Sequence, residues 1–327
     1  MLFLYNHADL IRKRMQKIMK KTFLRILAGL FVFTLSIPIT LYLVLQFLNK
    51  TNRKILSSSI LRKYLLYVPP SYNPDRPTPL VISFHGFAEW PAHQMEISRW
   101  NDLADEQGFI VAYPCGTGFP LRWRIYGEAG MENDPAKDVQ FISDLIDQLE
   151  GEYNIDPVRI YANGLSNGGG MTVSLSCRLA GRIAAVGTVS GAFLIPWDDC
   201  RPSRPVPLIA FHGTADPIVP YSGGNSRRFD LPFPAIPDWI AEYARRGGCT
   251  GDPKPLPGNG EASGIQYSND SGNMDVVFYT IQGGGHSWPG GGSLPKIIVG
   301  HTSQDIDATR TIWDFFQKHP LPTSTKL

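Results

Sequence analysis

The sequence predicts an α/β protein whose mostly parallel central sheet is covered by helices on both faces. From about residue 60 onward, short β-rich segments alternate with segments of helical periodicity, which is typical of this architecture. Long glycine- and proline-rich stretches follow three of the predicted strands. In open α/β sheets ligands bind at the carboxyl ends of the strands, so we expect the functional site among these loops.

The predicted strands are short runs of apolar, β-branched and aromatic residues. They are 63–68, 80–84, 110–113, 159–163, 185–189, 208–211 and 276–281. Apolar spacing predicts one helix over 139–149 and a closing helix over 306–316, with Ser303 as its expected N-cap. Loops are expected at 115–135, 217–237, 250–264 and 283–295.

The composition is that of an ordinary globular protein. Of 327 residues, 43% are hydrophobic and 18% are charged, which allows one large or two modest domains. The formal net charge is only +2, and the lysines and arginines are concentrated before residue 65. Because the globular part has no basic excess, we expect no nucleic-acid partner.

The first fifty residues contain an uncharged apolar stretch, 26–49. A helix of these 24 residues, at about 1.5 Å per residue, would cross the roughly 30 Å hydrocarbon core of a bilayer. Seven basic residues and one acid precede it, which by the positive-inside rule keeps residues 1–25 in the cytoplasm. We therefore predict a signal-anchor helix, a linker at 50–60 and an extracytoplasmic catalytic domain at 61–327.

A cleaved signal peptide, which would give a secreted protein, is the alternative interpretation of this stretch. The apolar run is longer than the usual signal core, and no small-x-small cleavage site follows it, so the anchor is favoured. A buried core helix ranks last, because such helices seldom have an all-round apolar surface of this length.

All four cysteines, Cys115, Cys177, Cys200 and Cys249, follow the apolar stretch. An extracytoplasmic location would place them in an oxidising compartment, where disulfides persist. Spacing alone leaves all three full pairings open. The sequence contains no C-x-x-C pair, and we expect neither a metal nor a cofactor.

The strongest local motif is G-x-S-x-G at 164–168, between a predicted strand and a helical segment. In a nucleophile elbow the serine occupies a sharp strand-to-helix turn, and the two glycines allow close approach of neighbouring backbone. A glycine-rich turn without chemistry is the alternative. The strand before it and the helix after it favour Ser166 as a nucleophile.

A serine hydroxyl needs a histidine base and a carboxylate that orients that histidine. Asp216 follows the predicted strand 208–211, and His286 follows the last predicted strand, which gives the order serine, acid, histidine found in α/β-hydrolases. The rivals for the acid are Asp198 and Asp199, and His301 is the rival for the base.

Acyl transfer also requires backbone N–H groups that stabilise the tetrahedral oxyanion. The amide after the nucleophile is that of Asn167, and the second is assigned to Phe87, after the strand that ends in His85-Gly86. His85 and His212, each before a glycine at a strand end, are interpreted as hydrogen-bonded structural residues.

With these residues in place, about 62–320 resembles the polyhydroxybutyrate-depolymerase-like and feruloyl-esterase-like α/β-hydrolases, which are related to the family-one carbohydrate esterases. The resemblance rests on Tyr67-Val-Pro-Pro, Pro79-Leu-Val-Ile-Ser-Phe-His-Gly, Asp138-Val-Gln-Phe-Ile, the segment 155–169 through the serine motif, His212-Gly-Thr-Ala-Asp-Pro-Ile-Val-Pro-Tyr and Gly285-His-Ser-Trp-Pro-Gly. It implies a carboxylic-ester hydrolase with the triad Ser166, Asp216 and His286. It also implies an oxyanion amide after His-Gly and substrate contacts from Trp288 and Trp123.

The sequence departs from the family pattern at Cys115 and Phe87, where an aspartate and a small residue or cysteine are frequent. The family partner of Cys249 is missing near 269–271, and the resemblance leaves Cys177 with Cys200 as the expected disulfide. Small or oligomeric esters are the expected substrates: hydroxyalkanoate oligomers, feruloyl esters or acetyl-sugar esters. A serine peptidase of related fold and a non-catalytic binding protein are the alternatives. The peptidase would normally carry a large extra domain, and the binding protein would require a broken triad.

Overall fold

The computed structural model describes residues 15, 19–25, 44, 50–125, 135–226, 232–292 and 295–322. The chain forms two compact units, Met1–Asn49 and Lys50–Leu327. Apart from Val44, the predicted span at 26–49 lies outside the described residues. Among the helices that the structure describes, none is both long and apolar enough for a membrane crossing. The signal anchor therefore stays a prediction.

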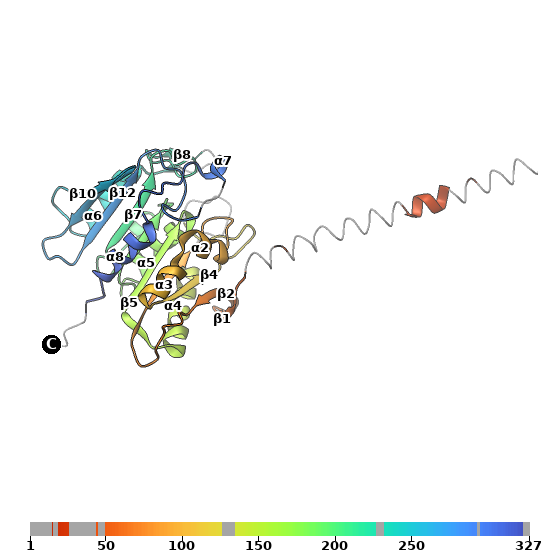
Figure 1. The fold of residues 1–327 in the computed structure, drawn as a ribbon, viewed down its shortest axis with the longest axis horizontal. Coiled ribbons are helices and arrows are strands. Elements are labelled where there is room, and N and C mark those ends of the chain that lie inside the picture. Colours follow the sequence, from red (N-terminus) through yellow and green to blue (C-terminus); the bar gives the residue numbers. More distant parts are fainter. Residues whose placement is uncertain are drawn as a thin grey trace, which may run out of the picture. The chain divides into compact units, whose positions relative to one another are not determined.

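The described part of the Lys50–Leu327 unit is built on a ten-stranded sheet in the order β1-β2-β4-β3-β5-β6-β7-β12-β11-β10 (Figure 1). The strands are β1 (Arg53–Ser57), β2 (Ile60–Tyr67), β3 (Thr78–Phe84), β4 (Ile110–Pro114), β5 (Ile155–Leu165), β6 (Val186–Val189), β7 (Leu208–Gly213), β10 (Lys254–Asn259), β11 (Ala262–Ser268) and β12 (Asp275–Ile281). A separate pair joins β8 (Gly224–Asn225) to β9 (Pro232–Phe233).

The centre of the sheet is parallel, from β4 through β3, β5, β6 and β7 to β12. Antiparallel strands flank it at both edges, β2 and β1 on one side and β11 and β10 on the other. This arrangement confirms the predicted mostly parallel sheet. All seven predicted strands are present, with boundaries that shift by one to four residues.

Helices pack on both faces of the sheet and enclose two apolar cores. On one face lie α4 (Ala136–Glu152), α5 (Asn167–Arg178) and α6 (Ile236–Arg246). On the other lie α2 (Pro91–Ser98), α3 (Trp100–Gln107) and α8 (Ala308–Gln317). A short helix, α7 (Lys296–Val299), lies in the loop after β12. Since α4 and α8 cover the two predicted helical segments, those predictions are confirmed.

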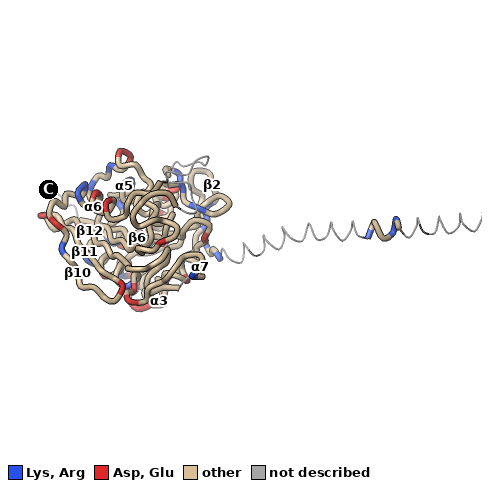
Figure 2. Tube along the Cα trace, turned by 90° about the horizontal axis from the view of Figure 1, so that it is seen from above, with Lys and Arg blue, Asp and Glu red and all other residues tan. Residues whose placement is uncertain are grey.

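The edge strands were not predicted, because they lack the apolar pattern of buried strands. β1 falls in the expected linker at 50–60, and its residues are mostly exposed. β10 and the start of β11 fall in the expected loop at 250–264, and β10 contains two prolines, which sheets tolerate mainly at edges. Figure 2 shows basic and acidic residues interspersed over this unit, including its β10–β11 edge.

The N-cap of the closing helix is also corrected. α8 begins after Asp307, whose carboxylate accepts a hydrogen bond from the Arg310 amide at 3.0 Å. Ser303, the expected cap, lies four residues upstream, and its hydroxyl accepts from the Asp305 amide at 3.4 Å. Asp and Ser are similarly good caps, so the position depends on where the chain turns into the helix.

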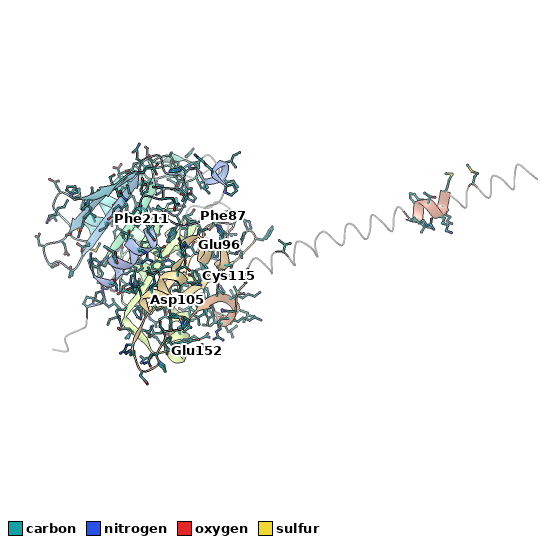
Figure 3. All side chains as sticks on the ribbon, viewed as in Figure 1. Phe87, Glu96, Asp105, Cys115, Glu152 and Phe211 are labelled. Carbon is teal, nitrogen blue, oxygen red and sulfur yellow. A yellow bond between two sulfur atoms is a disulfide. The ribbon has the colours of Figure 1, made fainter. Side chains whose placement is uncertain are left out.

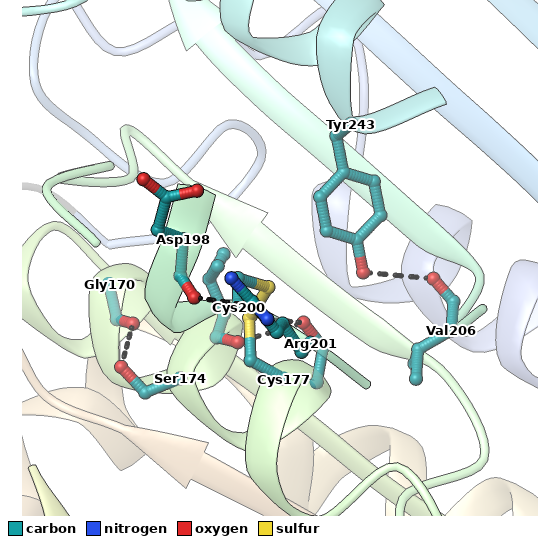
Figure 4. The surroundings of a disulfide bond; sticks show 10 residues. Gly170, Ser174, Cys177, Asp198, Cys200, Arg201, Val206 and Tyr243 are labelled. Atoms are coloured by element: carbon teal, nitrogen blue, oxygen red, sulfur yellow. Dashed lines mark hydrogen bonds between the residues drawn. A yellow bond between two sulfur atoms is a disulfide. The ribbon is translucent and has the colours of Figure 1, made fainter. Parts of the chain in front are cut away.

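A disulfide joins Cys177, in the last turn of α5, to Cys200, directly after the 3-10 turn Trp197–Asp199 (Figure 4). This confirms the pairing that the family resemblance implied. Closing a chain segment of 23 residues stabilises a fold by about 3 kcal/mol. Cys115 and Cys249 are buried, reduced cysteines.

Candidate active site

Ser166 lies at the turn that connects β5 to α5, as predicted. Its backbone has φ 56° and ψ −118°, a conformation that residues with a Cβ seldom adopt and that is frequent at functional sites. The turn is held because the Ser166 amide donates to the Val189 carbonyl at 3.0 Å. The Ser166 carbonyl accepts from the amides of Gly170 and Ala192, also at 3.0 Å.

The two glycines of the motif are required by close backbone packing. A Cβ on Gly164 would lie 2.4 Å from the carbonyl oxygen of Gly168. A Cβ on Gly168 would lie 2.4 Å from the Phe84 carbonyl oxygen and 2.6 Å from that of His85. These contacts are far shorter than van der Waals distance. A side chain on Gly168 would therefore push the start of α5 away from the chain that leaves β3.

Asp216 and His286 form a buried hydrogen-bonded pair. The His286 Nδ1 atom lies 2.7 Å from Asp216 Oδ2, and the aspartate side chain has no exposed surface. The other carboxylate oxygen accepts from the Ile218 and Val219 amides, each at 2.8 Å. Burial alone would raise the pKa of Asp216, but the charge and hydrogen bond of His286, with smaller contributions from His212 and the Ile218 amide, lower it below its ordinary value.

The sheet brings these residues to one edge. Ser166, Asp216 and His286 follow the carboxyl ends of β5, β7 and β12, which belong to the parallel centre. Leu165, the residue before the serine, and His286 line the same narrow cavity of about 10 Å³. Three residues that are up to 120 positions apart in the sequence thus follow the same edge of the parallel sheet, where Asp216 and His286 are in direct contact.

The turn after β3 carries the predicted oxyanion amide. Phe87, labelled in Figure 3, is half-buried there, and Asn167 is the first residue of α5. The turn is fixed because the Gly86 amide donates to Glu89 Oε2 at 2.9 Å and the Ala88 amide donates to the Leu121 carbonyl at 2.8 Å. Two backbone segments that can supply N–H donors thus lie on either side of the serine turn.

The side chains of Asn167 and Trp123 connect these two segments. Asn167 Oδ1 accepts from the Trp123 amide at 2.7 Å, and Asn167 Nδ2 donates to the Trp123 carbonyl at 3.1 Å. The indole N–H of Trp123 donates to the His85 carbonyl at 3.0 Å. Trp123 has 0% exposure and packs edge-on against Phe84, so its ring supports the turn after β3, and its contact with a substrate stays a prediction.

His85 is a structural histidine, as predicted. Its Nε2 accepts from the Gly116 amide at 2.9 Å, which leaves Nδ1 as the protonated nitrogen, 2.8 Å from the Gly86 carbonyl. Burial lowers the pKa of His85 to about 4. The imidazole is therefore neutral and ties the turn after β3 to the chain that follows β4.

Trp288 is the second predicted substrate contact that the structure encloses. It borders the narrow cavity beside His286, but it is only 1% exposed, and its indole N–H donates to Thr309 Oγ1 at 2.9 Å. The ring belongs to the core beneath α8. The ring is thus almost fully enclosed, and its contact with an acyl group stays a prediction.

Glu89 and His93 also line the cavity of His286, and the sequence reasoning missed them. His93 Nδ1 lies 3.5 Å from Glu89 Oε2. Burial opposes both charges, but their mutual attraction lowers the pKa of Glu89 and raises that of His93. The sequence signal that could have revealed them is an acid and a histidine spaced i,i+4 shortly after His85-Gly86, where Glu89 lies in the turn that leads into α2.

The rival residues make other side-chain contacts. The His301 carbonyl accepts from the Gly285 amide beside His286, but the His301 side chain is 41% exposed and pairs with Glu261 at 2.9 Å. Asp198 and Asp199 are exposed in the 3-10 turn beside the disulfide, where Figure 4 shows Asp198. Among the residues that the structure describes, no cluster of three or more His, Cys, Asp or Glu side chains could hold a metal ion.

Comparison with known proteins connects this site to a family. Residues 62–197 match the family model described as Esterase PHB depolymerase. The chain is 30% identical over 285 residues to the proposed esterase NocK of Nocardia uniformis, and the match covers 81% of this chain and 82% of NocK. The chain belongs to the PHB-depolymerase esterase family. The resemblance found in the sequence motifs is therefore confirmed.

One similar esterase extends well beyond the matched region. Feruloyl esterase B of Piromyces equi is 32% identical over 272 residues, which are 80% of this chain but 46% of that protein. This chain thus spans about half the length of that relative. The acetyl xylan esterase of Aspergillus awamori (TM-score 0.56, 14% identity, 81% of this chain and 98% of that one) has the same fold. So does a ferulic acid esterase of Anaeromyces mucronatus (TM-score 0.51, 16% identity, 82% and 89%).

Proposed function

We propose that this esterase-family protein hydrolyses carboxylic esters through an acyl-enzyme, with Ser166 as nucleophile, His286 as base and Asp216 as the supporting acid. The observation that carries the proposal is the 2.7 Å contact between His286 Nδ1 and buried Asp216, at the sheet edge where Ser166 occupies its strained turn. The contact fixes the imidazole so that its Nε2 is the free basic nitrogen.

In the first half-reaction the Ser166 oxygen attacks the ester carbonyl carbon while its proton passes to His286 Nε2. The carbon–alkoxy bond then breaks, and the alcohol leaves with that proton, which leaves an acyl-serine. In the second half-reaction water gives a proton to His286 Nε2 and attacks the acyl carbon, the bond from that carbon to the Ser166 oxygen breaks, and His286 returns the proton to Ser166 as the acid leaves. Asp216 remains ionised throughout and stabilises the imidazolium.

Each half-reaction passes through a tetrahedral oxyanion, which the amides of Phe87 and Asn167 would stabilise. Two features support this assignment. Asn167 begins α5, where backbone N–H groups are free of helical partners and the helix dipole favours negative charge. Gly168 also allows the start of α5 to approach the Phe84 and His85 carbonyls, directly before the Phe87 turn, more closely than a residue with a Cβ could.

The proposed substrates are esters of aromatic or short acyl groups, of the feruloyl or acetyl-sugar type. The names of two relatives, feruloyl esterase B and the bifunctional acetylxylan esterase/xylanase XynS20E of Neocallimastix patriciarum, support this class. Hydroxyalkanoate oligomers are the second candidate, which the name of the family model favours. Phe87 stays partly exposed beside the site, so it is the aromatic side chain placed to meet an acyl group.

The catalytic unit is proposed to act outside the cytoplasm, held at the membrane by residues 26–49, or secreted if that segment is cleaved. The disulfide between Cys177 and Cys200 supports an oxidising compartment. Either location would allow it to reach esters of extracellular polymers.

A substrate panel tests the proposed function. Purified protein is assayed on methyl ferulate, acetylated xylo-oligosaccharide, a 3-hydroxybutyrate oligomer and a matched peptide amide, with Ser166→Ala as the control. We expect Ser166-dependent hydrolysis of an aromatic or acetyl ester and none of the amide. Faster amide cleavage would instead indicate a peptidase, and binding without turnover by wild-type protein would indicate a non-catalytic role.

A further inference from the structure

A second histidine contacts the acid of the proposed triad. His212 lies on β7, one residue before its end, with 2% exposure. Its Nε2 atom is 3.4 Å from Asp216 Oδ2, the oxygen that also faces His286. The same Nε2 lies 2.9 Å from the Val219 carbonyl oxygen. This histidine is not needed for any step written above.

The hydrogen-bond partners determine which nitrogen of His212 carries the proton. A carbonyl oxygen only accepts, so Nε2 must be the N–H that donates to Val219. His212 Nδ1 is buried without a hydrogen-bond partner. A proton there would be a buried, unsatisfied donor, so the imidazole is neutral. In agreement, burial lowers the pKa of His212, although the nearby Asp216 charge opposes this effect.

Resting on the proposed function, we propose that His212 is a positioning residue that holds Asp216 and limits how strongly this acid stabilises protonated His286. The single N–H spans two acceptors on the Asp216–Val219 turn: the Val219 carbonyl at its end and the Asp216 carboxylate at its start. The turn is thereby attached to the rigid strand β7. Asp216 Oδ2, which contacts His286, also faces the positive end of the His212 N–H dipole, at a longer distance.

Two consequences follow from this arrangement. Without the His212 N–H, the turn keeps the hydrogen bond from the Asp216 amide to the Gly213 carbonyl but loses its second attachment to β7, so Asp216 orients His286 less well and kcat falls. The carboxylate also keeps more of its negative charge for the imidazolium of His286, so the acidic limb of kcat/KM moves to higher pH. Among described residues, the titratable groups near His212 are Asp216, His286 from the loop after β12, Tyr221, whose ring centroid is 6.2 Å away, and His301, which lines a common cavity with His212.

The test compares His212→Leu, which removes the donor, with His212→Gln, whose amide N–H can occupy about the place of Nε2. For His212→Leu we expect kcat to fall roughly tenfold with KM little changed, as for the loss of a buried hydrogen bond to a backbone carbonyl. The acidic limb should move up by roughly half a pH unit. His212→Gln should recover most of the rate and the original limb.

A second readout is independent of turnover. In a Ser166→Ala background, the low-field proton resonance between His286 Nδ1 and Asp216 is followed against pH by NMR. Its midpoint should rise in His212→Leu and return in His212→Gln. If the wild type proves to lack esterase activity while this midpoint still shifts, the proposed function fails and the role of His212 stands.

His319 offers a matched control. It is 9% exposed, and its Nε2 pairs with Asp275 at 2.8 Å, but Asp275 begins β12 at the end of the strand opposite His286. His319→Gln should lower the melting temperature without moving the pH profile. The proposal is overturned if His212→Leu behaves like this control, with a lower melting temperature and an unchanged acidic limb and NMR midpoint.

Discussion

The two sides of the serine turn are built by different kinds of interaction. On the acid–base side, a charged carboxylate and two imidazoles meet through side-chain atoms, and Asp216 alone serves both His286 and His212. On the proposed oxyanion side, backbone segments are held by several groups, chiefly the neutral, buried Trp123 and Asn167, together with the Glu89 carboxylate. We therefore expect the proposed catalysis to depend on single atoms on the first side and on several supports on the second.

The largest effect is therefore expected on the acid–base side. Ser166→Ala and His286→Ala should each lower kcat by roughly 10⁵–10⁶-fold, because residues that act as one unit lose the same transition-state stabilisation. The double variant should be little worse than either single variant. The measurement is steady-state kinetics at equal protein concentration. Circular dichroism checks that each variant is folded. Losses that multiply in the double variant would show that the two residues act separately.

A smaller loss of activity is expected from a substitution on the proposed oxyanion side. Asn167→Ala keeps the backbone amide but removes both hydrogen bonds to Trp123, so kcat/KM should fall only about tenfold and stability by about 1–3 kcal/mol. Ser174→Ala is the control on the same helix, since its hydroxyl bonds only to the Gly170 carbonyl (Figure 4). A loss in Asn167→Ala as large as in Ser166→Ala would contradict the redundancy of this side.

The oxyanion side should also give stability a dependence on pH. The pKa of buried His85 is lowered from 6.5 to about 4, so between these values the unfolded chain binds a proton that the folded chain does not. The free energy of unfolding should therefore fall as pH decreases from 6.5 to about 4. His85→Gln should show a flatter dependence in urea unfolding over this window. An unchanged slope in that variant would show that His85 is not the linked group.

The smallest effect is expected from the N-terminal unit, because both sides of the site lie within Lys50–Leu327. Protein starting at Lys50 should keep the kcat and KM of the full chain. Full-length protein should sediment with membranes and resist extraction by salt. Release of the full chain by carbonate would remove the anchor prediction, and a loss of activity on truncation would show that the site is incomplete without residues 1–49.

The sequence predicted what depends on local pattern. The parallel strands, the turn at Ser166 and the order of Ser166, Asp216 and His286 could be read from apolar runs and glycine spacing, because these elements follow from backbone geometry. Edge strands such as β1 could not, since an exposed strand needs no apolar alternation.

Burial of the site's aromatic residues could not be predicted either. A tryptophan beside a predicted base has the same local sequence whether its ring faces a substrate or the core. For Trp288 the contact with Thr309, 21 positions away, decides the matter. The pairing of His212 with Asp216 was likewise hidden, because a histidine before a glycine gives no sign of where its Nε2 points.

The central claim, that Ser166 is the activated nucleophile of this site, is tested most directly by covalent labelling. A fluorophosphonate ester reacts when a serine oxygen attacks phosphorus, fluoride leaves and the serine proton passes to the base. Intact-mass and peptide mass spectrometry should show one adduct per chain, on Ser166, with labelling abolished in Ser166→Ala and strongly slowed in His286→Ala. An adduct on another residue, or equal labelling of the His286→Ala variant, would contradict the account.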